Sequence, residues 1–164
     1  MTTGAAPIER TGGRVLVVDR AERVLLLRGT DPADPAAGTW WFTPGGGLDD
    51  GETAEQGALR ELAEETGLVL AELGPAVWTR TAEFDFMGSH YRQAETFFLV
   101  RVDGHDVDFG GFTEIERQAV HEFRWWSVAE LAATAETVYP SSLGAELALL
   151  LAEGRPSAPK VVAA

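Results

Sequence analysis

Residues 46–68 of the chain read GGLDDGETAEQGALRELAEETGL, and this stretch decides the local fold. Thr53 followed three residues later by Gln56 is a capping-box pattern, which predicts the start of a helix. Gly67 supplies the expected stop, because glycine readily takes the left-handed conformation that ends many helices. Apolar residues recur at helical spacing between these two signals, at Ala54, Ala58, Leu59 and Leu62. The sequence therefore predicts a helix over residues 53–66.

Three glutamates of this helix, Glu61, Glu64 and Glu65, stand at positions i, i+3 and i+4. Residues at this spacing project from one side of a helix, so their like charges repel one another. A divalent cation would turn this repulsion into binding, and all-oxygen ligation suits Mg²⁺, Mn²⁺ or Ca²⁺ rather than zinc. A solvated acidic helix face is the alternative interpretation, but it does not explain the proline-glycine loop, residues 44–47, that precedes the helix.

Arg60 stands four residues before Glu64 and eight after Glu52, within reach of both. Its neighbours are acidic, and rigid metal ligands need supporting contacts. We therefore interpret Arg60 as a residue that orients carboxylates rather than one that clamps a substrate.

The stretch resembles the Nudix box, G-x5-E-x7-R-E-U-x-E-E-x-G-U, without any departure. The matching residues are Gly46, Glu52, Arg60, Glu61, Leu62, Glu64, Glu65, Gly67 and Leu68. The resemblance implies an α+β or α/β fold, an α/β/α sandwich with a mixed central sheet. It also implies that Glu61, Glu64 and Glu65 are magnesium ligands, joined by the Gly46 carbonyl, and that Glu52 and Arg60 are structural.

The resemblance further implies an acidic residue on a downstream loop that ligates metal or serves as the base. The segment GGFTEIERQ offers Glu114 and Glu116, of which we favour Glu116, and Glu61 is the candidate base if no loop residue acts. The implied activity is Mg²⁺-dependent hydrolysis of the pyrophosphate bond in a nucleoside diphosphate linked to another group, for example a nucleoside triphosphate, releasing a nucleoside monophosphate. Mn²⁺ is a substitute cofactor. The alternative function is a Nudix-fold sensor that binds a nucleotide metabolite without turnover.

Outside the box, strands outnumber helices. Residues 14–28 predict two strands around a turn at residues 19–22, and further strands are expected at residues 75–86, 94–102 and 121–126. Ser127 with Glu130 predicts a second capped helix, and residues 141–152 a third. Small, polar or proline residues predict flexible ends at residues 1–12 and 154–164, which leaves residues 13–153 as one domain.

The chain has 164 residues, no cysteine and a formal net charge of −13. This charge disfavours nucleic acid polymers and anionic membranes as partners, so we expect a small nucleotide substrate, and a homodimer is left open. The absence of a long apolar run and of a signal peptide predicts a cytoplasmic protein. An enzyme for phosphorylated substrates would also need cations at its site to reverse the local sign of the charge.

Substrate contacts are predicted at Arg28, Arg92 and Trp41, because guanidinium groups suit phosphates and indole rings stack on bases. Arg80 is a further candidate for a phosphate contact, and a solvated surface position is the alternative for each arginine. Trp40 and Trp41 should point to opposite faces of a strand, so one of the two is expected in the core. The three histidines, His90, His105 and His121, have no partner at ligand spacing and are interpreted as incidental.

Overall fold

The computed structural model describes residues 6–103, 111 and 113–163. In these residues the strands are β1 (Ile8–Val18), β2 (Val24–Thr30), β3 (Thr39–Phe42), β4 (Gly45–Gly47), β5 (Ala76–Phe86), β6 (Ser89–Arg101), β7 (Val120–Trp126), β8 (Val138–Tyr139) and β9 (Lys160–Val161). The helices are α1 (Ala54–Thr66), α2 (Glu114–Ala119), α3 (Val128–Ala133) and α4 (Leu143–Glu153), with a short 3₁₀ helix, η1 (Pro35–Ala37).

The strands form one mixed sheet with the order β8-β3-β2-β1-β6-β5-β9. Strand β1 is its centre, because β1 pairs in parallel with β6 and antiparallel with both β2 and β4. Strand β7 adds to β2 outside the main path. The mixed central sheet expected from the sequence is confirmed.

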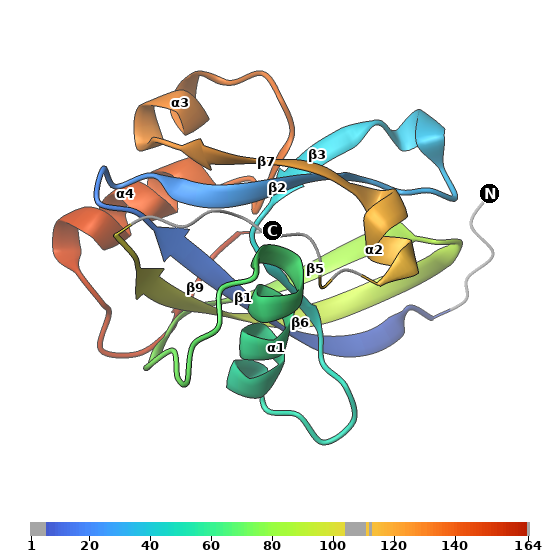
Figure 1. The fold of residues 1–164 in the computed structure, drawn as a ribbon, viewed down its shortest axis with the longest axis horizontal. Coiled ribbons are helices and arrows are strands. Elements are labelled where there is room, and N and C mark those ends of the chain that lie inside the picture. The colour runs from blue at the N-terminus through green and yellow to red at the C-terminus, as the bar shows by residue number, and fades with distance from the viewer. Residues whose placement is uncertain (1–5, 104–110, 112, 164) are drawn as a thin grey trace.

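Helices cover both faces of this sheet, as the alternation of side chains along β1 requires. Val15 and Val17 pack with Ala58 and Leu62 of α1. Leu16 and Val18 belong to the opposite cluster, which contains the α4 residues Leu143, Leu147 and Leu150. Figure 1 shows α1 in front of β1 and β6 near the middle of the view, with α3 and α4 beside each other at the upper left. The α/β/α sandwich is confirmed.

The box helix begins and ends where the sequence predicts. The Thr53 side chain accepts a hydrogen bond from Gln56 N, the Gln56 side chain accepts one from Thr53 N, and Gly67 ends α1 in the left-handed conformation with φ of 77°. The hairpin of β1 and β2 and the Ser127–Glu130 capping box of α3 are confirmed as well. These sequence signals act within a few residues, and the helix and strand positions in the folded protein agree with them.

Both chain ends are more ordered than the sequence suggested. Residues 8–12, which the sequence places in a flexible segment, pair with β6 as part of β1. In the expected C-terminal tail, β9 pairs with β5 and Val162 is buried. Strand pairing with distant segments holds both ends, and composition alone does not reveal such pairing. In the described part of the chain, no helix is long and apolar enough to span a membrane.

Candidate metal centre and substrate cavity

Three carboxylates meet at the side of α1 that faces α2. Glu61 and Glu65 come from α1 and Glu116 from α2, and one oxygen of each lies within 4.8 Å of the other two. Glu65 is only 3% exposed. Three acidic oxygens at this separation are a suitable set of hard ligands for a divalent cation.

Glu64 lies outside this cluster although the same helix carries it. An α-helix turns about 100° per residue, so Glu64 and Glu65 fall on opposite sides of Glu61. Arg60 is on the Glu64 side, and its Nη1 lies 3.4 Å from the Glu64 carboxylate. The structure therefore brings two of the three predicted glutamate ligands into the cluster and adds Glu116, while Glu64 as a ligand stays a prediction.

Arg60 is surrounded by carboxylates, as its spacing predicted. Its Nε lies 2.8 Å from Glu52 and its Nη1 lies 3.0 Å from Glu61, while Nη2 donates to the Gly47 carbonyl at 3.2 Å. The hydrogen bond from Arg60 lowers the pKa of Glu52 to about 2. Arg60 thus ties the glycine strand β4 to the helix and holds the Glu61 side chain.

The backbone of the glycine strand β4 lies directly against the carboxylate cluster. Gly45 N donates a hydrogen bond of 2.7 Å to Glu65 Oε1, which fixes one carboxylate oxygen. A Cβ on Gly46 would come 3.2 Å from Glu61 Oε1, so the absence of a side chain there leaves room for the carboxylate. The Gly46 carbonyl as a metal ligand stays a prediction.

The environment of the cluster favours protonated carboxyls when no cation balances them. Burial and the nearby Glu116 charge raise the pKa of Glu61 to about 7. Burial and the Glu61 charge raise the pKa of Glu65 as well, against the opposing effect of the Gly45 N–H. Both shifts reflect negative charges that are crowded and poorly solvated, which is the condition a bound cation relieves.

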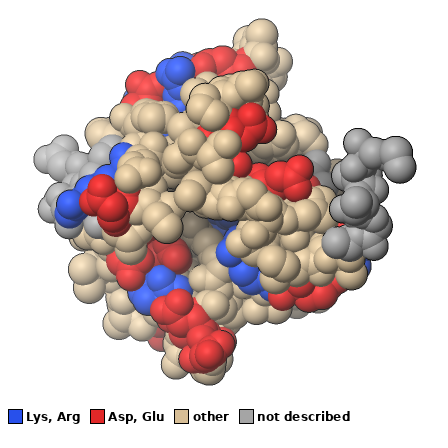
Figure 2. All heavy atoms as spheres, turned by 90° about the vertical axis from the view of Figure 1, so that its right-hand side faces the viewer, with Lys and Arg blue, Asp and Glu red and all other residues tan. Residues whose placement is uncertain are grey.

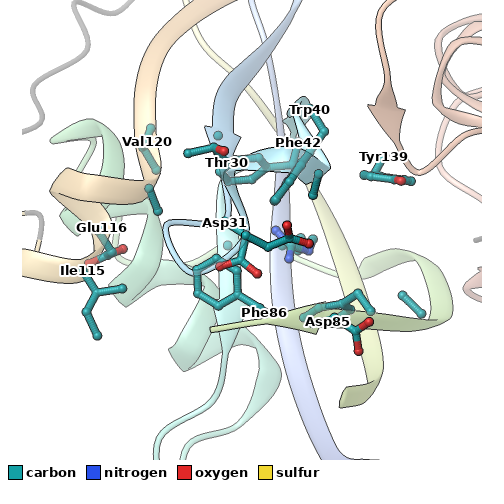
Figure 3. A pocket seen from close by; sticks show the side chains of 18 of the residues that line it. Thr30, Asp31, Trp40, Phe42, Asp85, Phe86, Ile115, Glu116, Val120 and Tyr139 are labelled. Carbon is teal, nitrogen blue, oxygen red and sulfur yellow. The ribbon is translucent and has the colours of Figure 1, made fainter. Parts of the chain in front are cut away.

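A cavity of about 560 Å³ adjoins the cluster, and Glu65 and Glu116 form part of its wall. This volume is typical of small-molecule sites. Figure 2 shows a hollow on the face that carries α2 and the β5–β6 hairpin, with basic atoms at the hollow and acidic atoms around it. In Figure 3 Trp40 and Phe42 lie on one side of the cavity and Phe86 and Asp85 on the opposite side. Aromatic walls of this kind can accommodate a planar base.

Three predicted substrate contacts do not reach this cavity. Trp41 is 3% exposed and packs edge-on against Trp126, because strand alternation turns Trp41 into the core and leaves Trp40 to line the cavity. Arg28 is paired with Glu122, and Arg92 with Glu9 and Glu83, on the surface. Trp41, Arg28 and Arg92 therefore lie outside the cavity lining, and their role as substrate contacts stays a prediction.

Sequence reasoning missed Arg10 and Arg14 of β1, which line the cavity together with Arg80 of β5. Arg10 lay in the segment expected to be flexible, so it was not considered. A signal was present: Arg10 and Arg14 are four residues apart in a strand and share a face. Gln93 and Glu95, two residues apart on the neighbouring strand, supply the matching polar positions.

Comparisons with known proteins agree with this geometry. The sequence profile of the NUDIX domain matches residues 8–143. An RNA pyrophosphohydrolase of Sphingopyxis alaskensis is 31% identical over 136 residues, which cover 77% of this chain and 80% of the relative. A protein of the same name from Novosphingobium aromaticivorans is 35% identical over 127 residues, covering 71% of this chain and 74% of the relative.

Solved structures share the fold at lower identity. The crystal structure of a MutT protein from Methanosarcina mazei has a TM-score of 0.62 at 18% identity and covers 93% of this chain and 100% of its own. A Caenorhabditis elegans Ap4A hydrolase complex has a TM-score of 0.60 at 18% identity and covers 87% of this chain and 98% of its own. At these identities the likeness concerns the fold alone.

The chain combines a mixed sheet between helices with a cluster of Glu61, Glu65 and Glu116 that is consistent with metal binding. The chain belongs to the Nudix hydrolase family and is an enzyme of the pyrophosphohydrolase class.

Proposed function

We propose that the protein hydrolyses the pyrophosphate bond of a nucleoside diphosphate linked to another group, with Mg²⁺ as cofactor and Mn²⁺ as a substitute. The observation that carries the proposal is the cluster of Glu61, Glu65 and Glu116 at the wall of the cavity. Carboxylates on two different elements meet there, and the cavity beside them has the volume of a nucleotide site. A nucleoside monophosphate is one product.

The residues of the cluster fit magnesium by their chemistry. Their donors are hard oxygens, and the chain contains no cysteine that would favour a softer metal. When bound, the metal would neutralise the pyrophosphate charge and lower the pKa of a water molecule. Glu61 and Glu65 are the ligands that the structure supports best, with Glu64 and the Gly46 carbonyl as further expected ligands.

Glu116 is the residue we assign as general base. It comes from α2, across from the two glutamates of α1, so it can take a proton from a water molecule held between the elements. Glu114 is less suitable, because it is exposed and lies outside the cluster, next to Gln118. Proton transfer to Glu116 accompanies attack of the water on phosphorus, and the P–O–P bridge breaks. Glu61 is the alternative base.

The nucleoside is assigned to the aromatic end of the cavity. Trp40 and Phe42 of β3 and Phe86 of β5 line this end, and stacking on aromatic rings stabilises a base by about 1–3 kcal/mol. Asp31 lies between these walls in Figure 3 and its carboxylate accepts from Met87 N and Ala33 N, which ties the β2–β3 loop to the β5–β6 turn.

A second candidate substrate is the end of an RNA chain, favoured by the names of the relatives at 31–35% identity. The net charge of −13 argues against it, because a long polyanion would be repelled by most of the surface. A free nucleotide therefore remains the preferred substrate.

The proposal is tested by incubating the protein and Mg²⁺ with nucleoside triphosphates, nucleotide sugars and 5′-triphosphorylated oligonucleotides, and separating the products by ion exchange. We expect release of nucleoside monophosphate from at least one free nucleotide. Faster turnover of the oligonucleotide would move the substrate to RNA. Binding of a nucleotide without any products would support the alternative function of a sensor.

A further inference from the structure

One buried aspartate, Asp31, joins the two sides of the cavity. It follows β2 directly, lines the cavity and is 4% exposed. Its Oδ1 accepts hydrogen bonds from Ala33 N at 2.9 Å and from Met87 N at 3.2 Å, and its Oδ2 also lies 3.2 Å from Met87 N. A buried carboxylate is costly unless hydrogen bonds satisfy it, so these backbone N–H groups fix the position of Asp31.

The contact between Asp31 and Met87 links strands that are not neighbours in the sheet. Strands β1 and β6 lie between β2 and β5 in the sheet order. Three strand spacings amount to roughly 14 Å in a flat sheet. Met87 belongs to the two-residue turn between Phe86 and Ser89 that joins β5 to β6. A hydrogen bond between Asp31 and this turn therefore means that the sheet curls until the end of β2 meets the β5–β6 hairpin.

Each side of this contact carries part of the aromatic end of the cavity. Trp40 and Phe42 stand on β3, which the chain enters from the loop that begins at Asp31, and Phe86 directly precedes Met87. Figure 3 shows Asp31 between the two groups of rings. The hydrogen bonds of Asp31 thus lie where they can hold one aromatic wall against the other.

The loop from Asp31 to β3 is bonded to itself, so β3 follows the position of Asp31. At the beginning of the loop, Asp34 N donates to the Asp31 carbonyl at 3.0 Å. At its end, Thr30 Oγ1 donates to the Gly38 carbonyl at 2.9 Å. The separation of the walls matters for stacking, because a gap of about 0.5–1 Å already forfeits a quarter to a half of the dispersion attraction between two surfaces.

We propose that Asp31 is a positioning residue that sets the separation of the aromatic walls and thereby the affinity of the cavity for the nucleobase of its substrate. This inference rests on the proposed function, which places the base at this end. Asp31 is not a member of the carboxylate cluster, so it acts on binding of the base and leaves the bond-breaking step unchanged. Its position matters more than its charge, because an amide oxygen accepts the same two N–H groups.

The test measures KM and kcat for the nucleotide that the native protein hydrolyses fastest, in Asp31→Ala, Asp31→Glu and Asp31→Asn. Alanine removes the acceptor, and glutamate keeps the charge but displaces the acceptor by one methylene group. Both variants should raise KM about 10-fold, because stacking on the base is weakened. In both, kcat should stay within about 3-fold of the native value. Asp31→Asn keeps an acceptor in place, so its KM should also stay within about 3-fold of the native value.

Imidodiphosphate serves as a probe without a base. Its inhibition constant in the presence of Mg²⁺ should change by less than about 3-fold in all three variants, because the walls do not contact it. Asp19→Ala is the matched control. Asp19 is 6% exposed and accepts from Ala21 N and Arg23 N in the β1–β2 turn, outside the cavity. This control should lower the melting temperature without changing KM.

Three results would overturn the role of Asp31. These are a native KM in Asp31→Ala and Asp31→Glu, an equal rise of KM and of the inhibition constant of imidodiphosphate, and a rise of KM in Asp31→Asn as large as in Asp31→Ala. If Asp31→Ala does not fold, Asp31→Glu decides the first two, and Asp31→Asn is then compared with Asp31→Glu.

A native protein that hydrolyses no nucleotide would refute the proposed function instead. Calorimetric titration with AMP, GMP, CMP and UMP then tests Asp31 separately. Binding of one of these nucleotides that is about 10-fold weaker in Asp31→Glu would support the positioning role. Equal affinities in the two proteins, or no binding to the native protein, would overturn it.

Discussion

At the scale of single residues, the glutamates of the site differ in burial and in hydrogen-bond partners, although they are chemically identical. Glu65 is buried and accepts a backbone N–H, whereas Glu64 is partly exposed and paired with Arg60. Glu116 shares the cluster from another helix and also caps that helix by accepting from Thr113 N at 3.0 Å. These contacts distinguish the proposed ligand, supporting and base roles more sharply than residue type does.

The role of Glu116 as base can be separated from that of a ligand by Glu116→Gln. The amide keeps a cap acceptor for Thr113 N but cannot take a proton. We expect kcat to fall by about 10²- to 10⁴-fold, the usual effect of removing a general base. Stabilisation by Mg²⁺, measured as a rise in melting temperature, should persist. Full activity would move the base to Glu61 or Glu114, and loss of the Mg²⁺ effect would make Glu116 chiefly a ligand.

At the scale of elements, the site depends on how α1 is held against strands β1 and β4. Arg60 connects Glu52, Glu61 and the Gly47 carbonyl, so it joins the loop before the helix, the helix and β4. Gly13 of β1 lies under the first turn of α1, where a Cβ would come 2.3 Å from the Ala54 carbonyl oxygen. The helix can approach the sheet this closely because this position has no side chain.

Replacing Arg60 with alanine should misplace the glutamates without unfolding the protein. We expect activity and Mg²⁺ affinity to fall about 10- to 100-fold, the usual effect of losing support for ligands. Enzyme assays and a Mg²⁺ titration measure both quantities. Arg20→Ala is the control, since Arg20 makes only an exposed pair with Asp103. Unaltered turnover and metal affinity in Arg60→Ala would remove the orienting role.

Gly13→Ala should push α1 away from the sheet. We expect the free energy of unfolding to fall by about 1–3 kcal/mol, as is usual for overpacking, together with weaker Mg²⁺ binding. Urea denaturation and a Mg²⁺ titration measure the two effects. A stability equal to that of the native protein would show that the helix does not rest on this glycine.

The sequence predicted the elements with local signals best. The caps at Thr53 and Ser127 and the glycine after α1 act within a few residues, so they are readable without the fold. The resemblance to the Nudix box supplied Glu116, whose approach to Glu61 depends on the packing of α2. Arg10 was missed because its place depends on pairing between β1 and β6, two segments distant in the sequence.

At the scale of the whole molecule, charge is distributed unevenly. The net charge is −13, the cavity is lined by three arginines as well as by acidic residues, and Glu65 and Glu116 of the carboxylate cluster are part of that lining. Without a cation, the crowding of Glu61 and Glu65 opposes folding, and burial of these groups increases the cost. Folding, metal binding and pH are therefore linked.

This linkage predicts how the metal-free protein responds to pH. Burial raises the pKa of Glu61 from 4.5 to about 7, so the folded protein retains a proton that the unfolded chain releases. This contribution to stability is fully present below about pH 4.5 and is lost as the pH rises to about 7. We expect the melting temperature in EDTA to fall across that range for this reason. The fall in melting temperature should be smaller in Glu61→Gln. Saturating Mg²⁺ should reduce this fall in the native protein. If the melting temperature changed equally with pH in the native and Glu61→Gln proteins, the raised pKa of Glu61 would not be its cause.

The central claim is that the cluster on α1 holds the metal that supports hydrolysis, and Glu65 tests it most directly. Glu65→Gln preserves an acceptor for Gly45 N, so the fold should remain, but it removes a ligand charge. The decisive measurement is the rate of nucleoside monophosphate release at increasing Mg²⁺ concentrations for the native protein and Glu65→Gln. We predict Mg²⁺-dependent release by the native protein and a loss of about 10³-fold in the variant, with weaker dependence on metal concentration. If Glu65→Gln released nucleoside monophosphate at the native rate and needed the same Mg²⁺ concentration as the native protein, Glu65 would not be a metal ligand and the central claim would be contradicted.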